Sequence, residues 1–356
     1  EPGSPLRQLI EDQRSLSLLL IGGSAAAAQA APINVPWSPD AALDSEVEFT
    51  SGDVTYYGSF RAPVGEVRGA ALLLPGSGPT DRNGNQDGIT PNTLAYTADV
   101  LAERGVATLR YDKFGSGRTG MAGLDPADSL GYTDQVDTAE AALNVLRERT
   151  GVASEDLAVL GHSEGSLTTL SLKDRGVDFG PVGLLAPPAL RYLDLMSLQL
   201  NAAFDRAVAG GQMTPEAASS ERARLAVSIE ALRAGQPLPY PEDPTLAPLG
   251  INPINATFLT EIDAVEPTSI AATLAPSTDV LLTCSEKDLN VSCDQIDGLH
   301  DALAGTDVEY ARFANASHTL GELGPLPATG VDLYLPLPLS SEFRGALGTW
   351  AENTFS

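Results

Sequence analysis

A serine stands between two glycines in Gly161-His162-Ser163-Glu164-Gly165, where an apolar run expected to be a strand meets an apolar run expected to be a helix. This is the pattern Gly-x-Ser-x-Gly at a strand-to-helix junction. The glycines permit a sharp turn that exposes the serine hydroxyl, and the following helix directs its positive N-terminal end toward developing negative charge. The pattern predicts that Ser163 is a nucleophile.

A serine hydroxyl needs a general base to become a good nucleophile, and the chain holds three histidines. His162 adjoins the serine, and we expect the tight turn to point its ring elsewhere. His300 falls in an expected helix, where a surface histidine is ordinary. His318 follows the last expected strand, within Asn-Ala-Ser-His-Thr-Leu. We therefore predict that His318 is the general base.

The base in turn needs a carboxylate that orients its ring. Asp288 follows an expected strand and precedes His318, which gives the chain order serine, acid, histidine. Glu286, Asp294 and Asp297 are the nearby alternatives. Asp288 is the predicted third member of the triad.

The two cysteines of the chain, Cys284 and Cys293, bracket Asp288. An exported protein can form a disulfide, and this one would rigidify the loop that carries the acid; the alternative is two unrelated thiols. The bridge would close a short loop and stabilise it by about 2–3 kcal/mol in the loop-entropy model. The spacing matches no zinc-site pattern, and with so few histidines no metal site is expected.

A tetrahedral intermediate needs N–H donors for its oxyanion. The backbone N–H of Glu164, directly after the nucleophile, is one predicted donor. The second is expected from the loop in Leu-Leu-Leu-Pro-Gly-Ser-Gly-Pro, where Ser77 N–H is our choice and Gly78 the alternative. The chain contains no Gly-x-x-x-x-Gly-Lys-Ser/Thr phosphate loop, and no cofactor is expected.

The elements that must position these residues alternate between strands and helices. A hairpin is expected at 46–62. The further strands are expected at 68–78 (with a glycine loop at its end), 106–112, 156–162, 181–187, 279–288 and 308–318. The helices are expected at 90–105, 132–151, from Ser163 onward, 295–303 and 340–353. The alternation predicts a mostly parallel sheet with helices on both faces, and ligands bind beyond the carboxyl ends of such strands.

Residues 188–276 interrupt this rhythm with two helical patterns, at about 190–209 and 214–234, and a proline-rich segment. We interpret them as a helical cap inserted between two parts of one core, 32–187 and 277–356. Residues 1–31 precede the core. They contain an apolar centre and then Ala28-Gln29-Ala30, a pattern typical of an export signal, so a secreted, periplasmic or cell-envelope protein is expected. The alternative is a disordered or loosely helical arm.

The chain is strongly acidic, with a formal net charge of −26. Such a surface repels nucleic acid and anionic lipid, so neither is an expected partner. The apolar run near the N-terminus is too short for a good membrane span, and no stable membrane insertion is expected. The sequence does not indicate an oligomeric state.

Three segments together resemble the α/β-hydrolase superfamily: LPGSGPTDRNGN at 74–85, RYDKFGSGRT at 110–119, and GHSEG. The resemblance covers about residues 45–355. Within the superfamily, the chain is similar to bacterial serine esterases whose oxyanion loop reads GSGPTDR-x-GN. It implies an eight-stranded sheet, a helical cap and ester hydrolysis through an acyl-enzyme. Two departures stand out. Pro75 occupies the place of the histidine in an HG oxyanion motif, and Glu164 stands where many esterases carry an apolar or small residue.

The expected function is a secreted carboxylesterase that hydrolyses short to medium acyl esters of small molecules. Acyl transfer and amide or peptide hydrolysis use the same triad and remain alternatives, while a non-enzymatic binding module would be favoured by a missing triad member. Glu164 is expected either to repel acidic substrates or to pair with an arginine. Asp81 and Arg82 are expected either at the pocket rim or in a structural salt bridge. The proline-rich segment 320–340 either lines the acyl pocket or forms a surface connection.

Overall fold

The fold is described from a computed structural model that covers residues 43–63, 65–124, 130–329 and 332–356. The predicted export signal at 1–31 lies outside the described residues. Among the residues that are described, none of the helices combines the length and the apolar character needed to cross a membrane.

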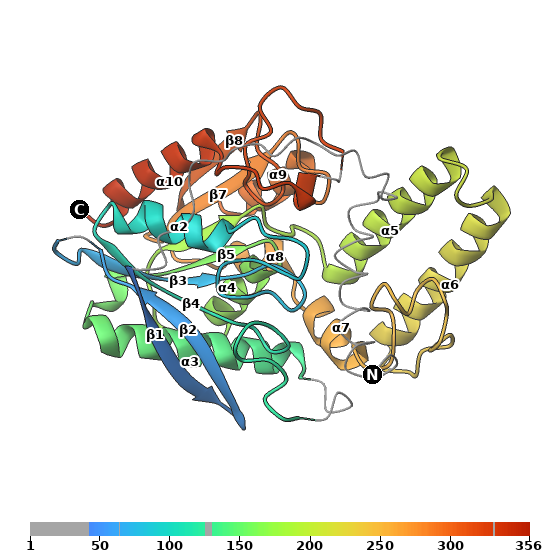
Figure 1. Cartoon of the computed structure of the whole chain (residues 1–356), viewed down its shortest axis with the longest axis horizontal. Helices are drawn as coiled ribbons and strands as arrows, with labels where there is room; N and C mark the ends of the chain where they lie inside the picture. Colours follow the sequence, from blue (N-terminus) through green and yellow to red (C-terminus); the bar gives the residue numbers. More distant parts are fainter. Residues whose placement is uncertain (1–42, 64, 125–129, 330–331) are drawn as a thin grey trace.

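One eight-stranded sheet runs through the molecule (Figure 1) in the order β1-β2-β4-β3-β5-β6-β7-β8. The β1–β2 and β2–β4 pairs are antiparallel, and all pairs from β4 to β8 are parallel. The strands are β1 Asp44–Ser51, β2 Val54–Arg61, β3 Gly69–Leu74, β4 Val106–Tyr111, β5 Leu157–His162, β6 Val182–Leu185, β7 Asp279–Ser285 and β8 Asp307–Phe313. The predicted mostly parallel sheet is confirmed.

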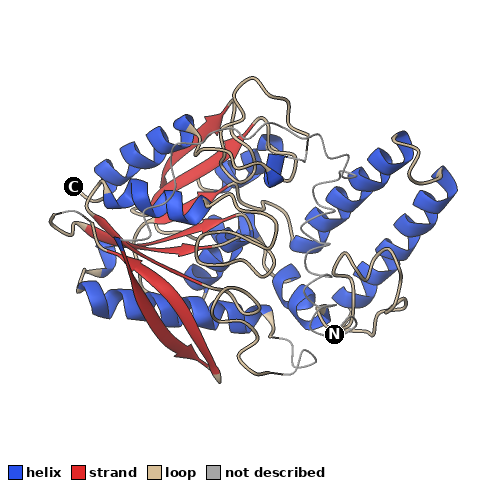
Figure 2. Cartoon of the chain, in the orientation of Figure 1, coloured by secondary structure: helices blue, strands red, loops and turns tan. Residues whose placement is uncertain are grey.

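Helices cover both faces of this sheet (Figure 2). One face packs against α2 (Thr93–Ala102) and α10 (Ser341–Thr354). The other packs against α3 (Tyr132–Thr150), α4 (Glu164–Asp174) and α9 (Cys293–Ala302). Every residue of β3, β4 and β5 is buried, as expected for central parallel strands that are covered on both faces.

Three helices between β6 and β7 form a lobe beside the sheet (Figure 1): α5 (Tyr192–Ala209), α6 (Pro215–Arg233) and α7 (Ala256–Asp263). The helices predicted at 190–209 and 214–234 are confirmed as α5 and α6. The carboxylate of Asp263 is buried in the lobe, where Arg191 and Arg233 donate to it at 2.7 and 2.8 Å.

The short helix α8 (Pro267–Ala271) falls within the predicted insertion 188–276 but does not join this lobe. It packs against α4 and α9 on the face of the sheet. The sequence interpretation placed these residues within the inserted cap and predicted no helix for them. The side chains of Ile270 and Ala271 are buried in the same core cluster as the side chains of α4 and α9.

Candidate active site

Ser163 occupies a sharp turn between β5 and α4. Its backbone has φ 51° and ψ −123°, a conformation that a residue with a side chain adopts only under strain. Glycine is required on both sides of this turn because a side chain would clash there. A Cβ on Gly161 would lie 2.1 Å from the backbone of Gly165, and one on Gly165 would lie 2.5 Å from Leu74 O. The Ser163 N–H donates to Leu185 O at 2.8 Å, which ties the turn to β6.

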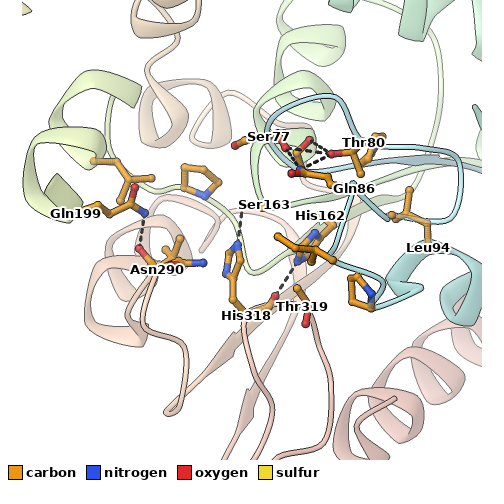
Figure 3. A pocket seen from close by; sticks show the side chains of 18 of the residues that line it. Ser77, Thr80, Gln86, Leu94, His162, Ser163, Gln199, Asn290, His318 and Thr319 are labelled. Atoms are coloured by element: carbon orange, nitrogen blue, oxygen red, sulfur yellow. Dashed lines mark hydrogen bonds between the residues drawn. The ribbon is translucent and has the colours of Figure 1, made fainter. Parts of the chain in front are cut away.

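A chain of hydrogen bonds links Ser163 to His318 and Asp288, and Figure 3 shows its first step, from Ser163 to His318. Ser163 Oγ lies 3.0 Å from His318 Nε2, and His318 Nδ1 lies 2.7 Å from Asp288 Oδ2. A carboxylate only accepts, so Nδ1 carries the proton and Nε2 is left to accept from the serine hydroxyl. Asp288 Oδ1 accepts from the N–H groups of Asn290 and Val291 at 2.7 and 2.9 Å, which fixes the carboxylate.

The alternative acids and bases lie in other contacts. Glu286 and Asp297 both accept from Arg312, at 3.0 and 2.8 Å. The ring of His300 stacks on Tyr310 with ring centroids 4.8 Å apart. None of these side chains lines the pocket that contains Ser163.

His162 does not point away from the site, so that prediction is wrong. Its ring lines the pocket together with Ser163 and lies 5.2 Å from the ring of His318, between centroids. His162 Nε2 lies 2.8 Å from His318 O, and because a carbonyl only accepts, Nε2 carries the proton. Burial, with a contribution from His318, lowers the pKa of His162 to about 4. The neutral ring therefore holds the backbone of the neighbouring histidine.

The two predicted oxyanion donors flank Ser163. Ser77 lies in the loop after β3 and lines the pocket, whereas Gly78 does not. A Cβ on Gly76 would lie 3.3 Å from Ser163 Cβ, so this loop passes directly beside the serine. Glu164 is the first residue of α4, where helix N–H groups lack a partner within the helix. In the described part of the chain, neither the Ser77 nor the Glu164 N–H has a protein acceptor.

The Glu164 side chain turns into the protein instead of the pocket. It is buried, and Lys113 Nζ donates to its Oε1 at 2.9 Å. Gln135 Nε2 donates to the same oxygen at 3.2 Å, and Tyr192 OH donates to Oε2 at 3.2 Å. The sequence left open whether Glu164 repels acidic substrates or pairs with an arginine; its charged partner is instead a lysine, 51 residues earlier in the chain.

Asp81 and Arg82 hold the oxyanion loop in place and do not line the pocket. Arg82 pairs with Asp112 at 2.8 Å and with Glu46 at 3.1 Å. Asp81 Oδ1 accepts from the N–H groups of Asn83 and Asn85 at 2.8 and 2.9 Å. The salt-bridge interpretation therefore holds for Arg82, with Asp112 and Glu46 as its partners, whereas Asp81 forms hydrogen bonds within its own loop.

The pocket above Ser163 is small and mostly apolar, with a cavity volume of about 100 Å³. Half of the residues that line it carry polar side chains, although most of the exposed lining surface is apolar. Among them, Gln199 donates from Nε2 to Asn290 O at 2.8 Å, which joins α5 to the loop that carries Asp288 (Figure 3). Among the residues that the structure describes, Thr319 is the last one in its wall, so no described residue of segment 320–340 lines it. Its apolar lining comes mainly from Pro75, Ile89, Pro91, Leu94, Pro188, Leu195, Met196 and Val291.

Cys284 and Cys293 form a disulfide. It connects β7 to the first turn of α9, and Asp288 lies inside the closed loop. The predicted pairing is therefore present.

Sequence reasoning missed the contributions of α5 to the site, namely Tyr192, Leu195, Met196 and Gln199. Their periodicity predicts a helix with an apolar face. Nothing in that pattern indicates that the face closes a pocket formed by loops more than 100 residues earlier and about 90 residues later.

No protein-family model matches the chain, and no curated protein is significantly similar to it in sequence. Solved structures do resemble it. The esterase Pf2001 of Pyrococcus furiosus aligns over 91% of this chain and 96% of its own, with a TM-score of 0.56 and 14% identity. The proline iminopeptidase of Mycobacterium smegmatis aligns over 87% of this chain and 99% of its own, with a TM-score of 0.54 and 19% identity.

A thermostable carboxyl esterase of Bacillus coagulans aligns over 76% of this chain and 90% of its own, with a TM-score of 0.50 and 15% identity. Likeness at these identities shows the fold. Together with the strand order and the helices on both faces, it shows that this chain has the α/β-hydrolase fold.

Proposed function

We propose that this protein is a serine hydrolase that cleaves carboxylic esters through an acyl-enzyme. The observation that carries the proposal is the continuous hydrogen-bonded chain from Ser163 through His318 to Asp288, at the floor of a pocket. A function cannot be read from a fold alone, so the argument rests on this geometry.

In the proposed reaction, Ser163 Oγ attacks the ester carbonyl carbon while His318 Nε2 takes the hydroxyl proton. Asp288 stabilises the imidazolium that forms. The N–H groups of Ser77 and Glu164 donate to the oxyanion, and the intermediate collapses when the alcohol leaves with the proton from His318. A water molecule then attacks the acyl carbon while His318 Nε2 takes its proton. The second intermediate collapses when Ser163 Oγ leaves with that proton, and the carboxylic acid is released. The cycle needs no cofactor.

The pocket supports esters with short to medium acyl chains as substrates. Its volume of about 100 Å³ leaves room for a few carbon atoms beside Ser163. Leu195 and Met196 of α5 and Val291 of the loop after β7 line this space, so a long acyl chain would have to extend beyond it. A predominantly apolar lining favours an uncharged acyl group.

We also infer that the protein acts outside the cytoplasm. A disulfide between Cys284 and Cys293 persists in an oxidising compartment, and the sequence pattern before the core is typical of an export signal. Alkylation of the protein in its native cells would test this inference, because an untreated sample should contain no free thiol. Two alkylated cysteines would contradict it.

The test of the activity is hydrolysis of p-nitrophenyl esters from acetate to palmitate by the wild type and by Ser163→Ala. We expect activity on the short and medium esters only in the wild type. Activity that rises steadily to palmitate would contradict the chain-length proposal. Activity retained by Ser163→Ala would contradict the assigned nucleophile. If the wild type cleaves p-nitroanilides or transfers acyl groups to added alcohols but hydrolyses no ester, the ester proposal fails in favour of an amidase or an acyltransferase.

A further inference from the structure

A buried polar cluster joins the two peptide groups assigned to the oxyanion hole, and the reaction steps above do not use it. Glu164 Oε1 accepts from Lys113 Nζ at 2.9 Å, and Oε2 accepts from Tyr192 OH at 3.2 Å. Both partners also reach the loop that carries the other donor. Lys113 Nζ donates to Gly76 O at 3.2 Å, and Tyr192 OH lies 3.2 Å from Ser77 Oγ.

The contact at Gly76 O sets the direction of the next N–H. The Gly76–Ser77 peptide bond is trans, so the C=O of Gly76 and the N–H of Ser77 point to opposite sides of one plane. An ammonium that holds the oxygen therefore turns the Ser77 N–H away from Lys113. Within the described residues this N–H has no acceptor, which leaves it available to a bound oxyanion.

The cluster is balanced in charge although it is nearly closed to water. The side chains of Lys113 and Glu164 are 10% and 1% exposed. A buried carboxylate is tolerated when it is paired and its oxygens are hydrogen-bonded, and Lys113, Gln135 and Tyr192 provide three donors. Burial, reinforced by Glu164, raises the pKa of Tyr192 well above its ordinary value, so the phenol keeps the proton that it donates.

We propose that Glu164 acts twice at the oxyanion hole. Its backbone N–H is one donor, and its carboxylate, through Lys113 and Tyr192, holds the Gly76–Ser77 peptide so that the second donor faces the oxyanion. Lys113 and Tyr192 are positioning residues in this scheme. The inference rests on the proposed function and deepens it, because it explains why a buried acid follows the nucleophile.

Two variants test the scheme in the full chain. Lys113→Met combined with Glu164→Gln removes the ammonium without leaving an unpaired buried carboxylate, and Tyr192→Phe removes only the phenol hydroxyl. The matched control is Lys173→Met, which removes a partly buried lysine that also donates to a backbone carbonyl, Phe179 O, outside the pocket.

The readouts are kcat and KM on a short p-nitrophenyl ester, and the affinity for a trifluoromethyl ketone, which forms a tetrahedral oxyanion with a serine. Removal of one oxyanion donor costs about 10²- to 10³-fold in kcat, so a misdirected donor should cost at least about tenfold. We expect that loss in kcat for the double variant, a smaller loss for Tyr192→Phe, KM within about twofold, and a parallel loss of ketone affinity. Lys173→Met should match the wild type in all three values.

Wild-type kcat and ketone affinity in both variants would overturn the positioning role. Equal losses in the variants and in Lys173→Met would also overturn it, because the effect would then be general destabilisation. A wild type that hydrolyses no ester and whose Ser163 does not react with a fluorophosphonate would refute the proposed function itself. An active, labelled wild type with unaffected variants would refute only the positioning role.

Discussion

The two sides of the candidate active site are held in place by different means. On the acid side, Asp288 is fixed by neighbours in the chain: its carboxylate accepts from the N–H groups of Asn290 and Val291, and the Cys284–Cys293 disulfide closes the loop around it. On the oxyanion side, the loop after β3 is held by side chains from distant segments, Lys113, Glu164 and Tyr192. The acid side relies mainly on local contacts, with Gln199 of α5 as one tertiary tie to Asn290 O. The oxyanion side has local contacts as well, such as Gln86 Nε2 to Ser77 O, but it also depends on buried side chains from distant segments.

This difference decides how each side should respond to substitution. When one contact of a local arrangement is removed, the other contacts persist, because the chain itself keeps the groups together. A tertiary arrangement of buried polar groups loses more stability when one partner is removed, since the remaining groups are left without hydrogen-bond partners. The predictions below probe that contrast, beginning with the largest effect.

Asp288→Asn is expected to lower kcat by about 10⁴-fold, because an amide can donate to His318 Nδ1 and favour the wrong tautomer. KM should change little. The comparison is Asp294→Asn, an exposed acid in the first turn of α9 that was an alternative candidate from the sequence. Steady-state kinetics on a short ester measure both. If the two variants lose activity equally, Asp288 is not the orienting acid.

His162 connects the two sides, since it is the last residue of β5, directly before Ser163, and donates to the His318 carbonyl. Its pKa is lowered to about 4 in the folded protein, so the unfolded chain binds more protons between about pH 6.5 and 4. The stability from this group is therefore complete above pH 6.5 and declines as the pH falls toward 4. The free energy of unfolding should drop by about 1.4 kcal/mol per pH unit in that window, about 3 kcal/mol in total.

Urea unfolding of the wild type and His162→Gln across this pH range measures the effect. The variant should be less stable at pH 7 and should show a flatter dependence on pH. Parallel curves for the two proteins would mean that His162 does not titrate in this way.

Removal of the disulfide in Cys284→Ala/Cys293→Ala is expected to lower the free energy of unfolding by about 2–3 kcal/mol, by the loop-entropy model for a short loop. The kcat of the folded variant should stay within about twofold of the wild type, because the contacts from Asn290 and Val291 still fix Asp288. Urea titration and steady-state kinetics test the two parts separately. A collapse of kcat in protein that is still folded would show that the acid side depends on the covalent bridge.

Met196→Ala is expected to give the smallest effect, on selectivity. Shortening this side chain enlarges the pocket on the α5 side, and each additional methylene of a substrate that it buries gains about 0.8 kcal/mol. The ratio of kcat/KM for hexanoate over acetate should rise about three- to tenfold. Met213→Ala, in the same lobe but outside the pocket, should leave the ratio unchanged. A rise in both variants would point to a looser lobe instead of a wider pocket.

The same contrast explains how much of the molecule could be predicted from its sequence. Ser163, Asp288 and His318 each follow the end of a strand, and strand ends meet at one edge of a parallel sheet, so the sequence predicts that they come together. The Cys284–Cys293 pairing could also be predicted from the sequence, because the two cysteines are only nine residues apart.

The other features of the site depend on packing between distant segments, and the sequence of each segment does not indicate which other segment it contacts. Lys113 reads as a loop lysine and Tyr192 as one apolar position of a helix, and only the fold brings both to Glu164. The prediction of the His162 orientation was wrong for the same reason, because that orientation is set by a hydrogen bond to a carbonyl 156 residues away in the chain. Helix α8 was not predicted, because its five residues are too short a segment for a helical pattern to be recognised.

The backbone at Ser163 has a consequence for any effort to improve this protein. A φ of 51° with ψ −123° suits glycine better than serine, so the residue proposed as the nucleophile is also one that opposes folding. A library sorted only for heat resistance would enrich glycine at position 163 and so collect robust but inactive proteins. Selection for durability and selection for turnover pull in opposite directions at this one position, and a useful screen has to score both.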